Sequence, residues 1–293
     1  MTGPTVDVIS DIACHLGEGP TYDPASGTLF WFDILGRRLL ARRDADGVTT
    51  VADLPELSSA LAVIDDGRQL LVTETGLHVR DLATGRLTLH TPVEADNPVT
   101  RSNDSRVHPC GAFWIGTMGK AAERKAGSIW WFFRGELRRL YPDFTIPNSI
   151  CFSPDGSIAY FTDTMKNILF RVDCDPATAL PVGEPNVFLD HRGKAGGIDG
   201  SVVDADGVLW NARWGTGTLD AYGPAGEHLR SIAIPARQVS CPAFFGPDAS
   251  RIAVTSAHEG MDAAARAADP KAGWTFAVEP GVRGRFEPRV LIA

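Results

Sequence analysis

The feature of this chain that most constrains its fold is a sixfold repeat. At six places an apolar pair is followed by a tight turn and then by a second apolar strand. Successive turns are 40, 44, 45, 51 and 42 residues apart, at Gly27, Gly67, Gly111, Gly156, Gly207 and Ala249. A period in the forties with two or more short strands per repeat indicates the blade of a β-propeller. We therefore expect an all-β protein, a six-bladed β-propeller with a central channel.

The repeat also determines the expected number of domains. A length of 293 residues alone favours about two domains, but a single blade cannot bury its own faces, so we expect one domain over residues 1–293. The strand-like segments 6–9 and 289–292 are expected to close the last blade onto the first. Two insertions, 119–127 and 258–273, interrupt the repeat. The second contains an Ala-rich stretch that favours a short helix.

Composition limits the partners and the compartment. A net charge of −8 and the lack of a basic run interleaved with aromatics argue against nucleic acid. No apolar stretch approaches the roughly 18 residues of a membrane span. The first ten residues lack the basic start and apolar core of a secretory signal. Five scattered cysteines without a C-x-x-C pair indicate reduced thiols, so we expect a cytoplasmic protein that is a monomer or a weak homo-oligomer.

One position of the repeat carries oxygen-bearing side chains. Eight or nine residues before the turns, the chain has Glu18, Ser59, Asn103, Asn148, Asp199 and Cys241. Equivalent positions of successive blades face a common channel, so these side chains are expected to converge. Glu18, Asn148 and Asp199 are hard oxygen donors suited to Ca²⁺, Mg²⁺ or Mn²⁺. Taken singly, the asparagine and the aspartate are better explained as turn residues that hydrogen-bond their own backbone. Their recurrence at one register favours a cation site with open positions for water and substrate.

Other candidate residues flank this position. Arg101 and Asn103 begin the inner strand of the third blade, and the planar fork of Arg101 suits an oxygen-rich substrate, although a surface ion pair is an alternative. His15 is interpreted as a structural histidine and His258 as part of a loop. Neither a G-x-S-x-G elbow nor a phosphate-binding G-x-x-x-x-G-K-[ST] loop is present, which disfavours covalent serine chemistry.

A series of short motifs runs from residue 16 to about residue 262 and covers nearly the whole chain. They are Leu16-Gly17-Glu18-Gly19-Pro20, Leu29-Phe30-Trp31-Phe32-Asp33-Ile34, Arg101-Ser102-Asn103-Asp104, Gly116-Thr117-Met118, Pro147-Asn148-Ser149, Ser153-Pro154-Asp155-Gly156, Thr162-Asp163-Thr164, Ile198-Asp199-Gly200 and Thr255-Ser256-Ala257. In these motifs and in their order the chain resembles the SMP-30/gluconolactonase/luciferin-regenerating-enzyme family.

The resemblance implies a six-bladed propeller with one divalent cation held by Glu18, Asn148 and Asp199. Ca²⁺ is the expected ion, and Zn²⁺, Mg²⁺ and Mn²⁺ stay open. It also implies that Arg101 and Asn103 contact the substrate and that the activity is hydrolysis of a sugar lactone. Many relatives carry an acidic pair after Gly-Thr-Met that contributes to substrate binding. Here residues 119–123 read GKAAE, which leaves Glu123 as a candidate substrate-binding residue.

We therefore predict metal-dependent hydrolysis of an aldonolactone to the aldonic acid, as in gluconolactonases of carbohydrate metabolism. Asp199 is the candidate catalytic residue, acting as general base. Two alternatives are a hydrolase of other esters or organophosphates on the same scaffold and a non-enzymatic, regucalcin-like calcium-binding regulatory protein. The loop 119–127 is expected to overhang the channel mouth and to influence which lactone is accepted, with a solvated surface loop as its alternative.

Overall fold

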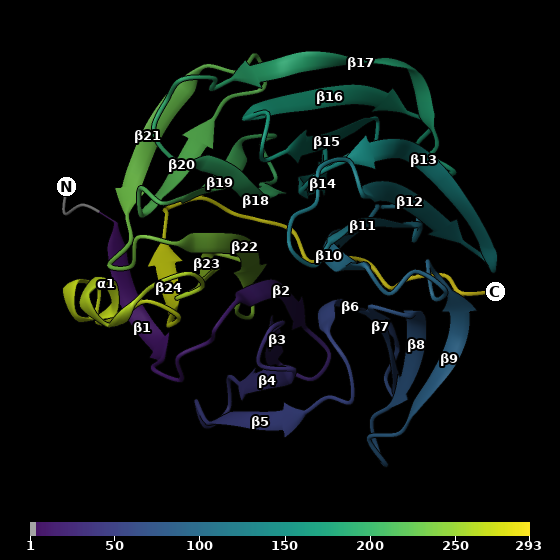
Figure 1. Cartoon of the computed structure of the whole chain (residues 1–293), viewed down its shortest axis with the longest axis horizontal. Helices are drawn as coiled ribbons and strands as arrows, with labels where there is room; N and C mark the ends of the chain where they lie inside the picture. The colour runs from purple at the N-terminus through teal and green to yellow at the C-terminus, as the bar shows by residue number, and fades with distance from the viewer. Residues whose placement is uncertain (1–3) are drawn as a thin grey trace. The chain divides into compact units, whose positions relative to one another are not determined.

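A computed structural model describes residues 4–293, so the first three residues of the N-terminal segment considered above lie outside it. In this range the chain forms six four-stranded antiparallel sheets and one short helix (Figure 1). Five of the sheets use four strands that are consecutive in the chain, and in the sixth β1 joins β22, β23 and β24. The predicted class, an all-β six-bladed β-propeller, is confirmed. Contacts divide the chain into two compact units of three sheets each. The single domain over residues 1–293 stays a prediction.

The first unit comprises residues 4–54 and 193–286. Its innermost strands are β2, β18 and β22. The sheets are β2 (Gly17–Asp23), β3 (Thr28–Asp33), β4 (Arg38–Arg43) and β5 (Thr49–Asp53); β18 (Gly197–Val203), β19 (Leu209–Trp214), β20 (Thr218–Tyr222) and β21 (His228–Ala233); and β22 (Val239–Phe245), β23 (Arg251–Ser256), β24 (Thr275–Glu279) and β1 (Thr5–Ser10).

The second unit comprises residues 55–192 and 287–293. Its innermost strands are β6, β10 and β14. The sheets are β6 (Ser58–Asp65), β7 (Arg68–Thr73), β8 (Gly76–Asp81) and β9 (Leu87–Pro92); β10 (Thr100–Val107), β11 (Phe113–Gly119), β12 (Gly127–Phe133) and β13 (Glu136–Phe144); and β14 (Pro147–Phe152), β15 (Ile158–Asp163), β16 (Ile168–Cys174) and β17 (Pro181–Asp190).

The six turns that define the repeat connect the innermost strand of each sheet to the second strand. At five of them the backbone is left-handed, with φ of 59° at Gly27, 90° at Gly111, 73° at Gly156, 84° at Gly207 and 56° at Ala249. Glycine adopts this conformation without a steric penalty, whereas a residue with a Cβ does not. Ala249 therefore has the same backbone conformation as four of the glycines, as its place in the repeat predicted.

The chain termini meet the prediction only in part. Strand β1 pairs antiparallel with β24, with Val6 opposite Val278, and so completes the last sheet as expected. The predicted strand at 289–292 was wrong. Its backbone N–H groups donate to single carbonyls of other segments, from Val290 to Val63 and from Leu291 to Gly111, so no ladder forms. Val290 is buried among the apolar side chains of the second unit, and this packing explains the apolar alternation that resembled a strand.

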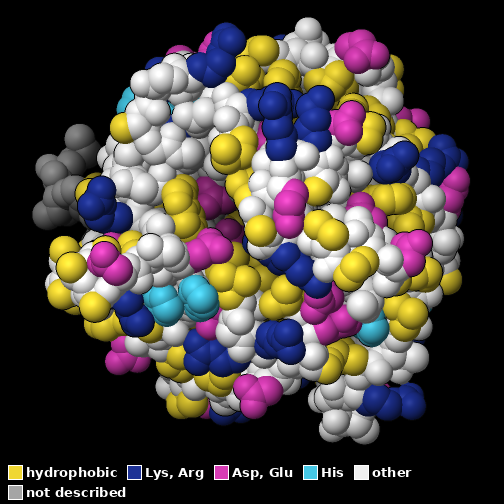
Figure 2. Space-filling model, in the orientation of Figure 1, with side chains coloured by type: hydrophobic (Ala, Val, Ile, Leu, Met, Phe, Trp, Pro, Cys, Tyr) yellow, Lys and Arg dark blue, Asp and Glu magenta, His cyan; other side chains and the backbone are white. Residues whose placement is uncertain are grey.

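The insertion 258–273 contains the expected helix, α1 (Ala263–Ala268). Asp262 caps it, because its side chain accepts a hydrogen bond from the N–H of Ala265. No helix in residues 4–293 is both long and apolar enough to cross a membrane. On the face shown in Figure 2, Lys and Arg side chains are interspersed with Asp and Glu side chains.

Within residues 4–293 the apolar core forms four clusters, and each cluster lies within one unit. Trp31 and Trp210 are fully buried in the first unit, and Trp114 is fully buried in the second. Burial of these large rings between neighbouring sheets supplies the stabilisation that one sheet alone lacks. The innermost strands are thereby held rigidly, which matters for the side chains that they carry.

Candidate active site

The innermost strands all break their pairing at the position that the repeat singled out. A register shift of this kind is a β-bulge, which kinks the strand and re-aims a side chain. The shifts lie at Glu18/Thr21, Ser58/Ala60, Ser102/Ser105, Asn148/Cys151, Ile198/Ser201 and Val239/Pro242. The six side chains of the predicted register lie at these bulges and are all buried. The structure therefore gives the sequence register a physical basis.

In the second unit the predicted residues form one hydrogen-bonded chain. Arg101 Nη1 donates to Asn103 Oδ1 at 2.8 Å, and Asn103 Nδ2 donates to Asn148 Oδ1 at 2.8 Å. All three side chains are at most 5% exposed. Asn103 Nδ2 also donates to the carbonyl of Pro147 at 3.0 Å, so both of its N–H groups are used. Asn103 therefore links the guanidinium to the second amide and can contact a substrate only through Oδ1.

The orientation of Asn148 follows from its two partners. Its Nδ2 donates to Thr164 Oγ1 at 2.9 Å, while its Oδ1 accepts from Asn103. An amide oxygen has two lone pairs, so one acceptor direction of Oδ1 remains. Asn148 is thus held with a hard oxygen donor in a fixed direction, as a cation ligand requires.

In the first unit, β2 and β18 carry the two carboxylates on either side of β22. Glu18 is 7% exposed and Asp199 is 4% exposed. The hydroxyl of Ser240 on β22 bonds the carbonyl of Gly17, beside Glu18. On the other side, a Cβ on Gly200 would lie 2.5 Å from the Sγ of Cys241, so the residue after Asp199 must be glycine. Buried carboxylates are costly unless they are paired with positive charge, and this pair fits a cation.

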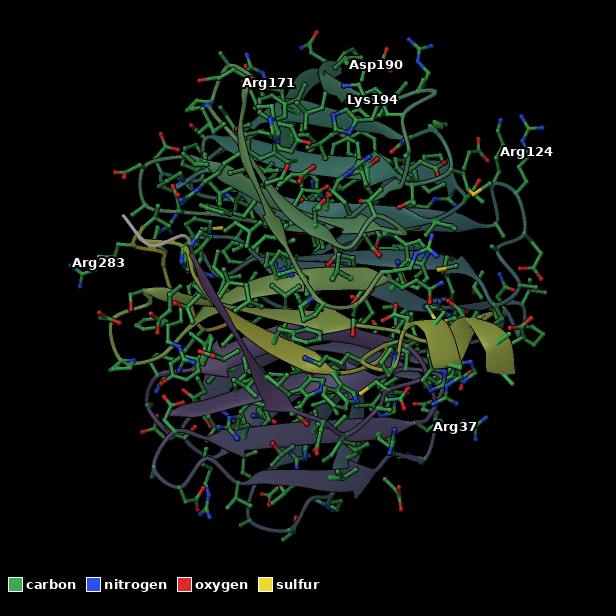
Figure 3. All side chains as sticks on the ribbon, turned by 90° about the vertical axis from the view of Figure 1, so that its left-hand side faces the viewer. Arg37, Arg124, Arg171, Asp190, Lys194 and Arg283 are labelled. Carbon is green, nitrogen blue, oxygen red and sulfur yellow. The ribbon has the colours of Figure 1, made fainter. Side chains whose placement is uncertain are left out.

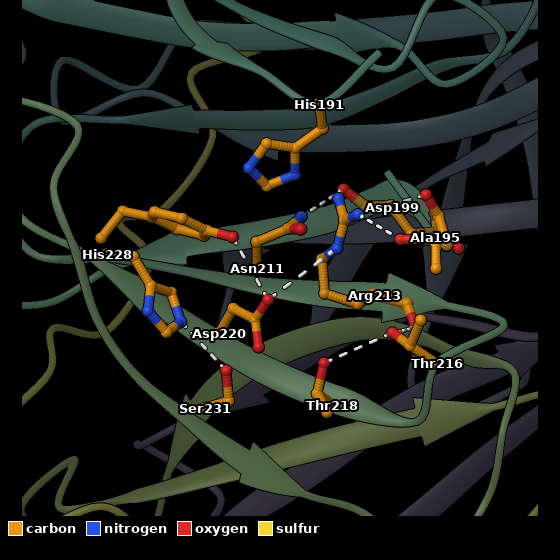
Figure 4. A network of polar contacts seen from close by, with 12 residues as sticks. His191, Ala195, Asp199, Asn211, Arg213, Thr216, Thr218, Asp220, His228 and Ser231 are labelled. Carbon is orange, nitrogen blue, oxygen red and sulfur yellow. Dashed lines mark hydrogen bonds and ion pairs between the residues drawn. The ribbon is translucent and has the colours of Figure 1, made fainter. Parts of the chain in front are cut away.

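The backbone around Asp199 is fixed by side chains of β19 (Figure 4). Asn211 Nδ2 donates to the carbonyls of Asp199 and Gly200 at 3.0 and 3.1 Å, which otherwise lose their partners at the bulge. Arg213 Nη2 donates to the carbonyls of Ala195 and Gly196, just before β18 begins. Burial lowers the pKa of Arg213. Sequence reasoning missed both residues.

A further feature that the sequence analysis missed is a set of carboxylates at the ends of second strands. Asp33 accepts from the N–H of Leu16, Glu74 from that of Leu57, and Asp163 from that of Ile146, at 3.0 to 3.1 Å. Each N–H lies two residues before a residue of the register, namely Glu18, Ser59 and Asn148. We call Asp33, Glu74 and Asp163 the rim carboxylates. The sequence signal was an acid closing an aromatic or β-branched strand, as in Trp31-Phe32-Asp33.

Two buried acids have pKa values shifted in opposite directions. Burial raises the pKa of Asp104, next to Asn103, to about 6, against the lowering effects of Arg106 and of the N–H of Ile150. Burial would also raise the pKa of Asp33, but hydrogen bonds from Leu16, Arg38, His15 and Gly36 outweigh it and lower that pKa. Asp33 therefore stays ionised as an anchor.

The predicted loop 119–127 leaves β11 at the end that pairs with the start of β10. Thr100 lies opposite Gly119 and Arg101 opposite Met118, so the loop begins beside Arg101 as expected. Glu123 is exposed, and its Oε2 accepts from the N–H of Ala121 at 3.0 Å, within its own loop. The role of Glu123 in substrate binding stays a prediction.

The two histidines singled out in the sequence lie together in the first unit. The rings of His15 and His258 stack with centroids 5.1 Å apart, and the N–H of His258 donates to the carbonyl of His15. Burial lowers the pKa of His258, and the positive charge of Arg266 lowers it further. Among residues 4–293, no group of three or more His, Cys, Asp or Glu side chains is placed to hold a metal ion. The predicted trio is outside that class because one of its members is an asparagine.

Comparison with known proteins decides the family. The model of the SMP-30/gluconolactonase/LRE-like region matches residues 16–258. The chain belongs to this family. A Rhizobium meliloti protein, provisionally named a sugar lactone lactonase, is 53% identical over 96% of this chain and 95% of its own. An L-arabinolactonase of Azospirillum brasilense is 38% identical over 93% and 91%. The crystal structure of a calcium-binding regucalcin from Agrobacterium tumefaciens matches with a TM-score of 0.96 and 50% identity over the full length of both chains.

Proposed function

We propose that this protein is a metal-dependent lactonase that hydrolyses a sugar lactone, an aldonolactone, to its aldonic acid. The observation that carries the proposal is the common bulge of the innermost strands, which buries two carboxylates in the first unit and the Arg101–Asn103–Asn148 chain in the second. The names of the similar proteins from Rhizobium meliloti and Azospirillum brasilense support the substrate class.

The residues that would hold the cation are Glu18, Asn148 and Asp199. They offer two carboxylates and one oriented amide oxygen, a donor set that fits Ca²⁺ first and also Mg²⁺, Mn²⁺ or Zn²⁺. When bound, the cation supplies Lewis-acid polarisation of the lactone carbonyl. The calcium-binding regucalcin of Agrobacterium tumefaciens supports a divalent ion.

The chain's own residues divide the remaining work. The guanidinium of Arg101 orients ring or hydroxyl oxygens, and Asn103 keeps both Arg101 and Asn148 in place. Asp199 acts as general base: it accepts a proton from water as the water oxygen bonds to the carbonyl carbon. The bond from that carbon to the ring oxygen then breaks, and the proton passes to the departing oxygen. One water is consumed and no covalent enzyme intermediate forms.

The test is hydrolysis of a panel of five- and six-membered sugar lactones by metal-replete protein and by chelator-treated protein. We expect turnover that is lost with chelator and restored by one added divalent ion. The absence of turnover on every sugar lactone would overturn the proposal. Tight Ca²⁺ binding without any turnover would instead favour a calcium-binding regulatory protein. An aryl-ester or organophosphate rate far above every lactone rate would favour a different hydrolase.

A further inference from the structure

The loop 119–127 holds one lysine next to Arg101. The N–H of Lys120 donates to the carbonyl of Val99 at 2.8 Å, which extends the pairing of Thr100 with Gly119 by one step. Lys120 therefore lies two ladder positions beyond Met118, the partner of Arg101. That separation is roughly 7 Å along a strand, comparable to the length of a six-carbon sugar.

The position of the Lys120 ammonium is fixed by a rim carboxylate. Lys120 Nζ lies 2.5 Å from Glu74 Oε2, while Glu74 Oε1 accepts from the N–H of Leu57. The Glu74 side chain is only 16% exposed, so it is a firm anchor, whereas the Lys120 side chain is 37% exposed. The ion pair thus ties the loop to the residue that follows β7 and leaves one side of the ammonium open to solvent.

The other rim carboxylates hold their cations differently. Arg38, the partner of Asp33, also donates to the carbonyl of Ala13 at 2.9 Å. Lys166, the partner of Asp163, is 3.8 Å away and lies over the ring of Phe144. An ammonium has three N–H groups. Within residues 4–293 Lys120 Nζ has Glu74 as its one partner, so two charged donors remain available to a ligand.

The rest of the loop does not compete for this role. Glu123 folds back onto Ala121, and Arg124 extends away from the ribbon into solvent (Figure 3). The loop is ordered by a bond of its own, from Ala122 N–H to the carbonyl of Gly119, and by one from Lys125 N–H to Thr145 Oγ1 outside it. Lys120 is therefore the charged member of the loop that lies on the β10–β11 ladder, two positions from the partner of Arg101.

We propose that Lys120 is a specificity-determining residue that selects sugar lactones with a carboxylate at the end of the sugar far from the lactone carbonyl. The inference rests on the proposed function, since Asn103 and Asn148 mark the carbonyl end and Arg101 leads from them toward Lys120. A carboxylate there accepts charge-assisted hydrogen bonds from Lys120, which a neutral hydroxymethyl group does not match. The positive charge of Arg101 adds to the attraction for such an anion.

The experiment compares galactaro-1,4-lactone with galactono-1,4-lactone, which differ only in a carboxylate or a hydroxymethyl group at the far carbon. The variants are Lys120→Gln, Lys120→Glu and, as a matched control that removes an exposed cation of the same loop, Arg124→Gln. In Lys120→Gln we expect the ratio of kcat/KM values, galactaro- over galactono-lactone, to fall about tenfold or more, through KM. Lys120→Glu should lower the ratio further, and Arg124→Gln should leave it within about twofold.

The possible outcomes distinguish a failure of the Lys120 inference from a failure of the proposed lactonase function. If the wild-type protein hydrolyses neither lactone nor any other sugar lactone, the proposed function fails. If it hydrolyses lactones but Lys120→Gln leaves the ratio unchanged, or lowers kcat/KM equally for both substrates, Lys120 only anchors the loop and the inference is overturned. The wild-type ratio should also decline as the salt concentration rises, because the selected contact is between charges at an exposed site.

Discussion

The two units present opposite chemistry at the same structural position. At the bulges of its innermost strands the first unit buries two carboxylates, Glu18 and Asp199, whereas the second buries two amides, Asn103 and Asn148, linked to the guanidinium of Arg101. The backbone device is the same in both, so the bulge does not determine the chemistry. The side chain that the bulge re-aims determines it, and the negative charge of the proposed site comes from the first unit alone.

Removing one proposed cation ligand from each unit tests the difference between the units most directly. Asp199→Ala should lower kcat at least about a thousandfold, since it removes both the general base and a charge that holds the cation. Asn148→Ala removes a neutral ligand and should cost less, about ten- to a hundredfold. Lactone hydrolysis at saturating metal measures both. Equal losses would mean that charge is not what distinguishes the two units.

Thermal stabilisation by Ca²⁺ supplies the control for that pair. The wild-type protein should melt at a higher temperature with Ca²⁺ than with chelator, because an ion that binds only the folded state stabilises it. Asp199→Ala should lose most of this increase, and Asn148→Ala should lose part of it. An Asp199→Ala protein that keeps both turnover and the Ca²⁺-dependent increase would remove Asp199 from the proposed site.

The rim carboxylates Asp33 and Asp163 allow a comparison of stability between the two units, with smaller expected effects. The carboxylate of Asp33 accepts a hydrogen bond from the N–H of Leu16 and forms an ion pair with Arg38. Asp33→Asn removes its negative charge and should therefore cost about 2–4 kcal/mol of unfolding free energy. Within residues 4–293, the ion partner of Asp163 is the half-exposed Lys166 at 3.8 Å, so Asp163→Asn should cost less, about 1–2 kcal/mol. Denaturant unfolding of the two variants measures the difference.

The pH dependence of Asp33→Asn checks the cause. The pKa of Asp33 is lowered in the folded protein, so its contribution is complete above the unfolded value of about 3.9 and is lost as the pH falls below it. The difference in unfolding free energy between the wild type and Asp33→Asn should therefore become smaller as the pH falls below about 4. A gap that is independent of pH would mean that packing, not ionisation, carries the effect.

The sequence was sufficient to predict the fold and the bulge register, because both repeat with a period that sequence alone displays. It failed where the structural cause is not periodic. Residues 289–292 alternate like a strand, yet Val290 and Leu291 bond separate carbonyls. Asn211 and Arg213 fix the backbone around Asp199 by donating to carbonyl groups, which leave no trace in residue identity. The pairing of Lys120 with Glu74 joins residues 46 positions apart, and no local pattern announces it.

A buried acid in the second unit should behave in the opposite way to Asp33. Because burial raises the pKa of Asp104 to about 6, ionisation of its carboxyl group destabilises the folded state as the pH rises from about 4 to about 6. Asp104→Asn keeps an acceptor for the N–H of Ile150 and should stabilise the protein at pH 7.5 by up to about 3 kcal/mol, with no gain near pH 4. A loss at pH 7.5 would show that Arg106 holds Asp104 usefully ionised.

The smallest expected difference concerns the hydroxyl groups that tie innermost strands together within each unit. Ser240 bonds the carbonyl of Gly17, beside Glu18, and Ser59 donates to the carbonyl of Asn103 or to Ser102 Oγ. Each Ser→Ala change should cost about 1 kcal/mol of unfolding free energy.

The same two variants should differ in function. If the first unit holds most of the cation ligands, Ser240→Ala should weaken Ca²⁺-dependent stabilisation with little change in KM. If the second unit serves the sugar, Ser59→Ala should raise the KM for lactone and leave Ca²⁺ affinity nearly unchanged. The reverse pattern in this matched pair would contradict the division of chemistry between the two units.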